Sequence, residues 1–351
     1  MEFKIQNKMV GGGHPLFFIA EAGVNHNGSI DIGKKLIDIA VEAGADAVKF
    51  QTFKTENIIT PDAPKSTYHV ETTGGDSTQT WFELLKTQEM SRNMHVKLIE
   101  HCNQNGIIFL STPYDEESAD LLEDLDVQAF KIASTDTNNI PLLRYIARKG
   151  RPMIISTAMA TMDEVKNAVS SVREERLAEI AVLQCTGNYP ARLPDSNLHV
   201  IKTYRDQLHC IVGYSDHTMD LINPVAATAL GANLYEKHFT IDKTLPGPDH
   251  RMALDPKELK QTVKIIRDTE LALGHPEKQV LDGEKENRVK LRKSIIANCD
   301  IPINTIIDKE MISIKRPGYG MPPAMFDEAI GKKVNRNISK YEPLDYEDLV
   351  Q

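Results

Sequence analysis

Two short segments, Val212-Gly-Tyr-Ser-Asp-His-Thr218 and Leu234-Tyr-Glu-Lys-His-Phe-Thr240, decide how this chain is interpreted. Each is an apolar run that ends in polar residues, and each contains one histidine near its end, His217 or His238. If the two runs are parallel strands joined by a crossover helix at 223–230, both histidines lie at the carboxyl ends of neighbouring strands. Proteins of the α/β class place their chemistry at that edge. The pattern therefore predicts a site in which two imidazoles can share one metal ion.

The same alternation of apolar run and helical pattern continues toward both ends of the chain. Further strands are predicted at 16–20, 47–51, 107–112, 129–134, 152–157 and 180–185, and helices at 31–43, 92–103, 116–125, 140–148, 162–173, 197–204 and 256–273. Eight strands, each followed by a helix, within about 270 residues are typical of a (β/α)8 TIM barrel. An open doubly wound sheet is the alternative, but it rarely has eight evenly spaced strands. The polar excursion at 52–88, with the only tryptophan, Trp81, is long enough to be a functional loop or lid.

The character of the sequence changes after Leu273. We predict a catalytic barrel at 1–273, a charged and weakly periodic linker at 274–292, and a small β-rich module at 293–351, where short apolar pieces alternate with turn signals. A module of about sixty residues is near the lower limit for independent stability, so we expect it to dock on another surface.

Composition narrows the class of protein. The chain has 351 residues, of which 41% are hydrophobic, and a formal net charge of −9. An acidic protein is a poor nucleic-acid binder, because a phosphate backbone requires a basic surface. We see no secretory signal pattern and no run long enough to cross a membrane, and the four scattered cysteines fit reduced thiols. We therefore expect a cytoplasmic protein with no nucleic-acid or membrane partner.

The side chains at the predicted carboxyl strand ends share a chemical bias toward binding anions. Lys49 and Lys131 stand within apolar strands, where an unpaired ammonium is costly. Hydroxyls at several strand ends are donors that can ring a phosphate, with the lysines as counter-charges. The alternative is that the lysines only pair with Glu21, Glu236 or an aspartate. The other strand-end candidates are Asn25, His26, Gln51, Ser111, Thr112, Ser134, Ser156, Thr157, Thr186, Asn188, Tyr189, Ser215, Asp216, Lys237 and Asp249.

Two imidazoles completed by water or carboxylate oxygens suit a divalent ion such as Mn²⁺ better than structural zinc, with Mg²⁺ or Co²⁺ as alternatives. Its open positions can hold and polarise a substrate carbonyl. A lone histidine near a strand end is more often structural, so the prediction depends on the pair.

Several motifs together resemble the sialic acid synthase family, the bacterial nonulosonic acid synthases. The resemblance covers essentially the whole chain, and the motifs are specific jointly rather than singly. The matching stretches are Ile19-Ala-Glu-Ala-Gly-Val-Asn-His-Asn-Gly, Gly44-Ala-Asp-Ala-Val-Lys-Phe-Gln-Thr-Phe-Lys, Phe109-Leu-Ser-Thr-Pro, Lys131-Ile-Ala-Ser, Gly213-Tyr-Ser-Asp-His-Thr, Glu236-Lys-His-Phe-Thr, Pro246-Gly-Pro-Asp-His and Lys315-Arg-Pro-Gly-Tyr-Gly. The last of these lies in what is similar to the family's antifreeze-like (SAF) module.

The resemblance implies condensation of phosphoenolpyruvate with N-acetylmannosamine, or a closely related 2-acetamido mannose derivative, and water to give N-acetylneuraminate and phosphate. It implies that His217 and His238 hold the metal, which activates the sugar aldehyde. It further implies a domain-swapped homodimer in which Arg316 enters the partner's barrel and binds the N-acetyl group. We predict as catalytic Glu21, Lys49, Lys131 and His238. We predict as substrate-binding Gln51, Thr112, Ser134, Asp136, Ser156, Asn188, Tyr189, Ser215, Glu236, Asp249 and Arg316.

Two departures from the family's pattern bear on the sugar. Asp136 stands where family members often have a glutamate, and Gly187 stands where a polar residue often helps to hold phosphoenolpyruvate, a role Asn188 can take. The alternative sugar is therefore a 6-deoxy diacetamido relative, as in legionaminic or pseudaminic acid synthesis. Two further classes remain as alternatives: a metal-dependent barrel hydrolase and a non-catalytic carbohydrate-binding protein.

Overall fold

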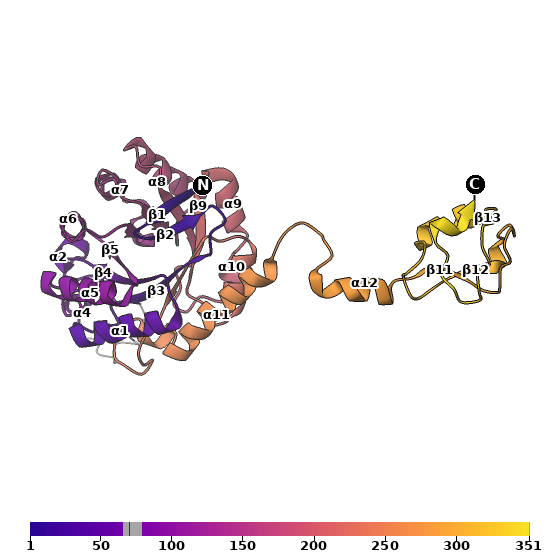
Figure 1. Ribbon diagram of the computed structural model, residues 1–351. Helices are drawn as coiled ribbons and strands as arrows, with labels where there is room; N and C mark the ends of the chain where they lie inside the picture. Colours follow the sequence, from indigo (N-terminus) through magenta and orange to yellow (C-terminus); the bar gives the residue numbers. More distant parts are fainter. Residues whose placement is uncertain (66–69, 71–78, 351) are drawn as a thin grey trace. The chain divides into compact units, whose positions relative to one another are not determined.

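The computed structural model describes residues 1–65, 70 and 79–350 (Figure 1). The chain divides into two compact units, Met1–Gly274 and His275–Gln351, and each is described by itself. Among the described residues, no helix combines the length and apolar character needed to cross a membrane.

The first unit is a closed barrel of eight parallel strands in the order β10-β3-β4-β5-β6-β7-β8-β9, with helices around it (Figure 1). This confirms the predicted (β/α)8 TIM barrel. Its strands are β3 (Phe17–Gly23), β4 (Ala47–Thr52), β5 (Ile108–Pro113), β6 (Phe130–Ile132), β7 (Met153–Ser156), β8 (Ile180–Cys185), β9 (Ile211–Asp216) and β10 (Leu234–His238). The helices that follow them are α1 (Ile30–Ala43), α5 (Arg92–Asn105), α6 (Glu116–Asp124), α7 (Ile140–Ala147), α8 (Met162–Glu174), α9 (Val200–Leu208), α10 (Ile222–Ala229) and α11 (Pro256–Leu273).

Local sequence sets the ends of these helices. Helix α1 begins after Ser29, whose side chain accepts a hydrogen bond from the backbone N–H of Ile32, and it ends at Gly44, where φ is 81°. A left-handed residue at that position is most easily a glycine. Helix α8 begins with a capping box between Thr161 and Glu164, in which each side chain accepts from the other's backbone N–H.

Two features differ from the sequence prediction. An amino-terminal hairpin of β1 (Glu2–Ile5) and β2 (Lys8–Gly11) was not predicted, because four-residue strands carry too little periodicity to be recognised. The predicted excursion at 52–88 contains two short helices, α2 (Thr55–Ile58) and α4 (Trp81–Lys86). The rest of that prediction falls largely on 66–69 and 71–78, which lie outside the described residues.

Alternation along the strands separates two cores and positions the site. One core contains side chains from seven of the barrel strands, from Ala129 immediately before β6 and from the hairpin, but none from the surrounding helices, so it fills the barrel interior. The residues of opposite parity, such as Val48, Phe50 and Tyr235, pack in a second core together with the helices. Alternate residues of each strand point into the barrel. Lys49 therefore points inward like Ala47, and Glu236 and His238 point inward like Leu234, nearer the carboxyl ends of the strands. Polar residues of the same parity therefore face into the upper barrel.

The second unit has a separate small core of ten buried residues that includes Ile295, Ile307 and Leu344. Its strands form two antiparallel pairs, β11 (Ser294–Ala297) with β12 (Ile312–Lys315) and β13 (Lys333–Val334) with β14 (Leu349–Val350). Helix α13 (Phe326–Ala329) lies between them in the chain. This agrees with the predicted small β-rich module. The segment predicted as a linker contains an exposed helix, α12 (Lys285–Leu291).

Candidate active site

A cavity of about 290 Å³ opens at the carboxyl ends of the barrel strands. Twelve of the predicted site residues line it, and they come from all eight barrel strands or the loops that follow them. They are Glu21, Lys49, Gln51, Thr112, Lys131, Ser134, Ser156, Tyr189, Ser215, His217, Glu236 and His238. Tertiary structure thus gathers into one cavity side chains that are up to 217 positions apart in the chain, as for Glu21 and His238.

Lys49 lies at the centre of the first polar group in the cavity. Its Nζ lies 2.7 Å from Glu21 Oε2 and donates to Thr112 Oγ1 at 3.0 Å. Burial lowers the pKa of Lys49, but the carboxylates of Glu21 and Glu236 outweigh this effect and raise it above its usual value. Lys49 therefore stays charged inside the barrel.

Lys131 lies at the centre of the second group. Its Nζ donates to Ser156 Oγ at 2.6 Å and to the Ile132 carbonyl at 3.2 Å, and lies 3.6 Å from Glu236 Oε1. Burial lowers the pKa of Lys131, and the neighbouring charge of Lys49 adds to this, although Glu236 opposes it. A second negative charge near Lys131 would therefore stabilise its ammonium form.

Glu236 connects the two groups. Its Oε1 accepts from Ser215 Oγ at 3.2 Å and lies 4.0 Å from Lys49 Nζ. Burial raises its pKa, but Lys131 and Lys49 outweigh this and hold it below the usual value. The sequence left open whether the lysines bind an anion or only pair with carboxylates. The structure is compatible with both, because the lysines pair with carboxylates and also line a cavity with hydroxyl donors.

Glu21 has an ionisation suited to proton transfer. It is 1% exposed, and Gln51 Nε2 donates to its Oε1 at 3.2 Å. Burial raises the pKa of Glu21 to about 7, with Lys49 lowering it and Glu236 raising it. A carboxyl group with a pKa near neutrality can act as a general base at physiological pH.

His217 and His238 lie beside each other, with 5.5 Å between their ring centroids. His217 Nδ1 must carry its proton, because it lies 2.7 Å from the Thr186 carbonyl, which only accepts. In the neutral form of His217, the lone pair is therefore on Nε2. His238 Nδ1 is buried without a hydrogen-bond partner among the described residues, and Asp249 Oδ2 lies 3.7 Å away. Tyr189 covers the pair, its ring centroid 4.2 Å from that of His217.

This donor set fits a divalent ion only if solvent or substrate completes the coordination. An imidazole nitrogen binds such an ion at about 2.1 Å, so two ring centres 5.5 Å apart are within reach of one ion. The described residues contain no group of three or more His, Cys, Asp or Glu side chains arranged to hold a metal. Two imidazoles with available lone pairs therefore fit an open site and do not fit a closed structural one.

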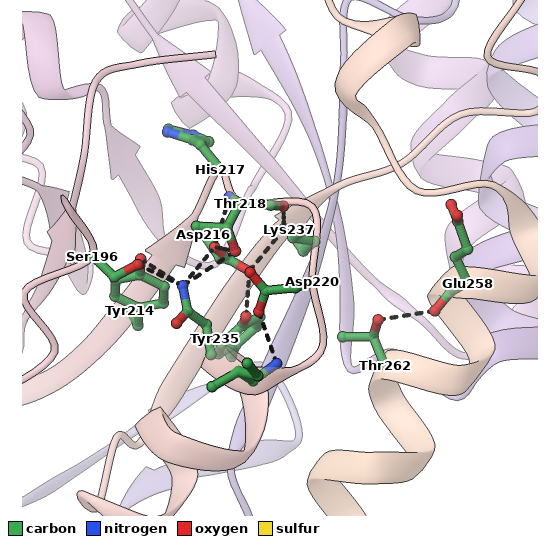
Figure 2. A network of polar contacts seen from close by, with 12 residues as sticks. Ser196, Tyr214, Asp216, His217, Thr218, Asp220, Tyr235, Lys237, Glu258 and Thr262 are labelled. Carbon is green, nitrogen blue, oxygen red and sulfur yellow. Dashed lines mark hydrogen bonds and ion pairs between the residues drawn. The ribbon is translucent and has the colours of Figure 1, made fainter. Parts of the chain in front are cut away.

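Asp216 and Lys237, which we collected as strand-end candidates, lie on the opposite face of the barrel wall. Figure 2 shows Lys237 and Tyr235 directed toward the Asp216 carboxylate. Thr218 donates to the same carboxylate from both its backbone N–H and its hydroxyl, at 2.9 and 2.8 Å. Lys237 also donates to the Thr218 carbonyl. These residues have the outward parity of their strands, so they hold the chain next to the histidines and do not line the cavity.

Four of the residues predicted to be catalytic or substrate-binding lie outside the cavity lining. Asp136 lines a neighbouring cavity, Asn188 is exposed, and Arg316 is exposed in the second unit. Asp249 lies close to the site, because a Cβ placed on Gly23 would be 3.3 Å from both Asp249 Oδ2 and Glu21 Oε1. Tyr114, Met159 and Cys185 also line the cavity and were not predicted from the sequence. Strand parity would have indicated Cys185, which follows Ala181 and Leu183 on the interior face.

A larger cavity of about 780 Å³ lies around residues that precede the strands, including Leu16 and Asp46, at the amino-terminal end of the barrel. Its charged side chains are paired: Arg267 lies 2.8 Å from Asp46 and 3.0 Å from Glu270. It therefore lacks the convergence of hydroxyls, lysines and histidines seen at the other end.

Comparison with known proteins agrees with this geometry. Residues 36–278 match the NeuB family, and residues 292–350 match the SAF domain. The chain is 42% identical to an N,N'-diacetyllegionaminic acid synthase of Legionella pneumophila, covering 95% of this chain and 94% of the relative. It is 39% identical to the human N-acetylneuraminate-9-phosphate synthase, covering 93% and 90% of the two chains.

A solved structure extends the likeness to three dimensions. The N-acetylneuraminic acid synthetase of Leptospira borgpetersenii, in complex with citrate, matches with a TM-score of 0.71 and 32% identity, covering 82% of this chain and 95% of that one. Together with the eight-stranded barrel, these matches place the chain in a known group of proteins: it belongs to the NeuB family of sialic and nonulosonic acid synthases, with a barrel followed by a SAF domain.

Proposed function

We propose that this protein condenses phosphoenolpyruvate with an N-acetylated amino sugar of the mannose type, releasing phosphate and forming a nonulosonic acid. N-acetylmannosamine and its 6-deoxy diacetamido relatives are the candidate sugars. The observation that supports this most is the placement around one cavity of two buried lysines, two histidines and the hydroxyls of Thr112, Ser134, Ser156 and Ser215. An anionic co-substrate would account for the lysines and the hydroxyls, and an aldehyde held at a metal ion would account for the histidines.

Phosphoenolpyruvate would bind between the two lysine-centred groups. Lys49 with Thr112, and Lys131 with Ser156, present ammonium and hydroxyl donors to the cavity, and Ser215 and Ser134 add further hydroxyls. Charge-assisted hydrogen bonds of this kind are the strong ones in carboxylate and phosphate recognition. The lysines would also stabilise the negative charge on the departing phosphate.

A divalent ion, with Mn²⁺ as the expected species, would be held by His217 and His238. When bound, such an ion supplies Lewis acidity that polarises the aldehyde of the sugar. The hydrogen bond from His217 Nδ1 to the Thr186 carbonyl fixes the orientation of the ring and leaves Nε2 as the nitrogen that can bind the metal. Tyr189 and Asp249 border this part of the cavity and would contact the sugar.

The reaction forms one carbon–carbon bond and replaces the carbon–oxygen bond to phosphate with one to water. The enol carbon of phosphoenolpyruvate attacks the aldehyde carbon, whose oxygen takes up a proton and becomes a hydroxyl. Water adds to the resulting cationic carbon and loses one proton. Phosphate then leaves together with the remaining hydroxyl proton, and the ketone forms. Glu21 would accept the proton of that water, since its pKa of about 7 makes its carboxylate available near neutrality. The two lysines keep their protons and hold the phosphate while this occurs.

Arg316 would act in a second copy of the chain, as a contact for the N-acetyl group in a domain-swapped homodimer. It is exposed in the C-terminal unit. An exposed guanidinium on a small module is available for a site in another subunit.

The test is an assay of purified protein with Mn²⁺, phosphoenolpyruvate and a panel of 2-acetamido mannose derivatives, monitored for phosphate. The expected result is phosphate release that requires both the metal and a sugar. Phosphate release that ignores the sugar would favour a metal-dependent hydrolase. Absence of release with every sugar would favour a carbohydrate-binding protein, and either result would overturn the proposal.

A further inference from the structure

Two sequence motifs to which the proposed reaction gives little role meet beside the candidate active site. The motif Asn25-His-Asn-Gly28 follows β3, and the motif Pro246-Gly-Pro-Asp-His250 lies between β10 and α11. Asn27 of the first motif contacts His250 of the second, although the two residues are 223 positions apart. The second motif also contains Asp249, so this contact bears on the site.

The side-chain amide of Asn27 connects both ends of the segment that carries Asp249. Asn27 Nδ2 donates to the Pro246 carbonyl at 3.0 Å, and Asn27 Oδ1 lies 3.3 Å from His250 Nε2. The Pro246 carbonyl only accepts hydrogen bonds, so the amide nitrogen must face it and the amide oxygen must face the His250 ring. These two contacts are named the Asn27 bridge.

The His250 ring is oriented to complete the Asn27 bridge. The residue is 1% exposed, and burial lowers the pKa of His250 to about 4, although Asp242 opposes this, so the ring is neutral near pH 7. Nε2 must carry the proton, because Asn27 Oδ1 only accepts. Nδ1 can then accept from Thr240 Oγ1, which lies 2.6 Å away. The ring therefore connects the segment after β10 with the loop after β3.

Gly247 packs closely against the same ring. A Cβ at this position would lie 2.7 Å from His250 Cδ2 and 3.2 Å from Asn27 Oδ1. A side chain there would push the ring and the amide apart. The segment from Pro246 to His250 thus packs against the Asn27 bridge, which restricts the backbone that carries Asp249.

The Asp249 carboxylate depends on this backbone for its position. Among the residues that the structure describes, no side chain donates a hydrogen bond to it. Its Oδ2 nevertheless lies 3.7 Å from His238 Nδ1, a buried nitrogen without a hydrogen-bond partner in the described part of the chain. The place of the carboxylate beside His238 is therefore set by the segment that the Asn27 bridge holds.

The same two loops are also joined nearer the strands. Asn25 Nδ2 donates to the Phe239 carbonyl at 2.8 Å, and the Phe239 N–H donates to the Glu21 carbonyl at 3.0 Å. These contacts hold the ends of β3 and β10 together independently of Asn27. Removing the Asn27 bridge should therefore loosen the segment around Asp249 without separating the strands.

We infer that Asn27 and His250 are positioning residues, which hold the Asp249 carboxylate beside His238 and so orient that imidazole for metal binding. A histidine that binds a metal usually donates its other ring N–H to a carboxylate or a carbonyl, which fixes its tautomer. Asp249 Oδ2, now 3.7 Å from His238 Nδ1, needs to approach by only about 0.5–1 Å to make this hydrogen bond. The inference rests on the proposed function, because it takes His238 to be a metal ligand. Neither Asn27 nor His250 lines the catalytic cavity.

The experiment measures the Kd for Mn²⁺ by titration of the metal-free protein, followed by electron paramagnetic resonance. The variants are Asn27→Gly, Asp249→Asn and the double variant. Glycine suits the left-handed backbone of Asn27, whose φ is 46°, and removes only the amide. Each single variant is expected to raise the Kd by about 10-fold, the lower end of the range for losing a partner that orients a metal ligand. If Asn27 acts through Asp249, the double variant should bind Mn²⁺ no more weakly than Asp249→Asn alone.

Further variants separate positioning from a general loss of stability. His250→Gln keeps an amide N–H that can reach Asn27 Oδ1, so it should bind Mn²⁺ more tightly than His250→Ala. Asn197→Gly is the matched control for Asn27→Gly, because Asn197 also has φ of 46° but is exposed and does not line the catalytic cavity. It is expected to keep the wild-type Kd. Urea unfolding shows that each variant is folded.

Three results would overturn the positioning role. They are wild-type Mn²⁺ affinity in folded Asn27→Gly protein, additive losses in the double variant, and equal binding by the two His250 variants. Each of them leaves the proposed function standing. Failure of the wild-type protein to bind Mn²⁺ would instead overturn the metal site of the proposed function, and the positioning role with it.

Discussion

Asp216 and Lys237 form a buried ion pair on the outer face of the barrel, with 2.7 Å between Asp216 Oδ2 and Lys237 Nζ. They are register partners on the neighbouring strands β9 and β10, and each immediately precedes one of the paired histidines, His217 and His238. Since side chains alternate along a strand, the ion pair lies outside the barrel and the histidines lie inside. From this adjacency we predict that the ion pair helps to hold the two strand ends, and with them the two imidazoles, in place.

Removing one partner of this pair should weaken both the fold and the metal site. Asp216→Asn or Lys237→Met leaves a buried charge unpaired, which costs about 3–5 kcal/mol of unfolding free energy. We expect a higher Kd for Mn²⁺ as well, because the ends of β9 and β10 lose the ion pair that connects them. Urea unfolding and Mn²⁺ titration measure the two effects.

The double variant Asp216→Asn/Lys237→Met should recover part of the stability, because neither charge is then left alone. Tyr204→Phe is the control, since it removes a buried hydroxyl that contacts Thr157 Oγ1 at 2.9 Å away from the histidines. It should cost about 1 kcal/mol and leave Mn²⁺ binding unchanged. Wild-type Mn²⁺ affinity in folded Asp216→Asn protein would contradict the positioning role.

Metal binding itself should depend on both histidines. His217→Ala and His238→Ala each remove one of two protein ligands, so either variant should bind Mn²⁺ at least about tenfold more weakly in a titration followed by electron paramagnetic resonance. His101→Ala is the control, because His101 pairs with Asp38 on the helical layer at 2.6 Å. If one histidine variant keeps full affinity, the two imidazoles do not share an ion.

Phosphoenolpyruvate binding should depend on Lys131. Replacing it with methionine removes an ammonium that hydrogen-bonds Ser156 inside the cavity. A charge-assisted hydrogen bond contributes about 1.5–3 kcal/mol, so calorimetry should show affinity for phosphoenolpyruvate reduced by about 10- to 150-fold. Lys149→Met is the control, because Lys149 forms ion pairs with Asp120 and Glu123 and does not line the cavity. Equal losses in both variants would indicate a general electrostatic effect.

Activity should rise with pH through the ionisation of Glu21. The pKa of Glu21 is raised to about 7, so the carboxylate form needed to accept a proton is depleted below that pH and dominates above it. In the free enzyme, kcat/KM should therefore fall on the acid side with an apparent pKa near this value. Glu21→Gln should lower kcat by about 10²- to 10⁴-fold and remove this acid limb. An unchanged limb in Glu21→Gln would assign the ionisation to another group.

A side chain at Gly23 should reduce activity as well as stability, because it would contact two carboxylates at the site in addition to straining the backbone. The φ of Gly23 is 54°, and a Cβ there would lie 3.3 Å from both Glu21 Oε1 and Asp249 Oδ2. Gly23→Ala should cost about 1–2 kcal/mol in stability and also reduce kcat/KM by displacing these carboxylates. Gly44→Ala separates the effects, because Gly44 has φ of 81° with only Val263 near its Cβ position, at 3.8 Å. It should cost similar stability and leave kcat/KM unchanged.

Much of the barrel follows from local pattern. The strand predicted at 180–185 and the helix predicted at 140–148 agree with β8 and α7 to within one residue. Both have uninterrupted apolar periodicity and clear boundaries. The amino-terminal hairpin could not be recognised in this way, because Phe3, Ile5 and Val10 become meaningful only when they pack on the barrel interior.

The candidate site also has a part that could be predicted from the sequence and a part that depends on tertiary structure. Residue type and position at the strand ends sufficed to single out Lys49, Lys131, His217 and His238, because charged or metal-binding side chains that end apolar strands require a local partner. Whether such a side chain faces the cavity or the helices depends on parity within a closed barrel. Asp216 and Lys237 carry the same chemistry as their neighbours but face outward.

The neighbouring cavity that Asp136 lines depends on packing and not on local sequence pattern. Phe53, Ile59, Trp81 and Leu85 have no periodicity that marks them as a binding surface, and they come from short helices in a long excursion. The chain order therefore determined the barrel and the chemical groups at its mouth, since strand periodicity and side-chain chemistry are local properties. Only tertiary structure decided which groups meet, at what distance and in which cavity, because those relationships depend on barrel closure and on contacts between residues far apart in the chain.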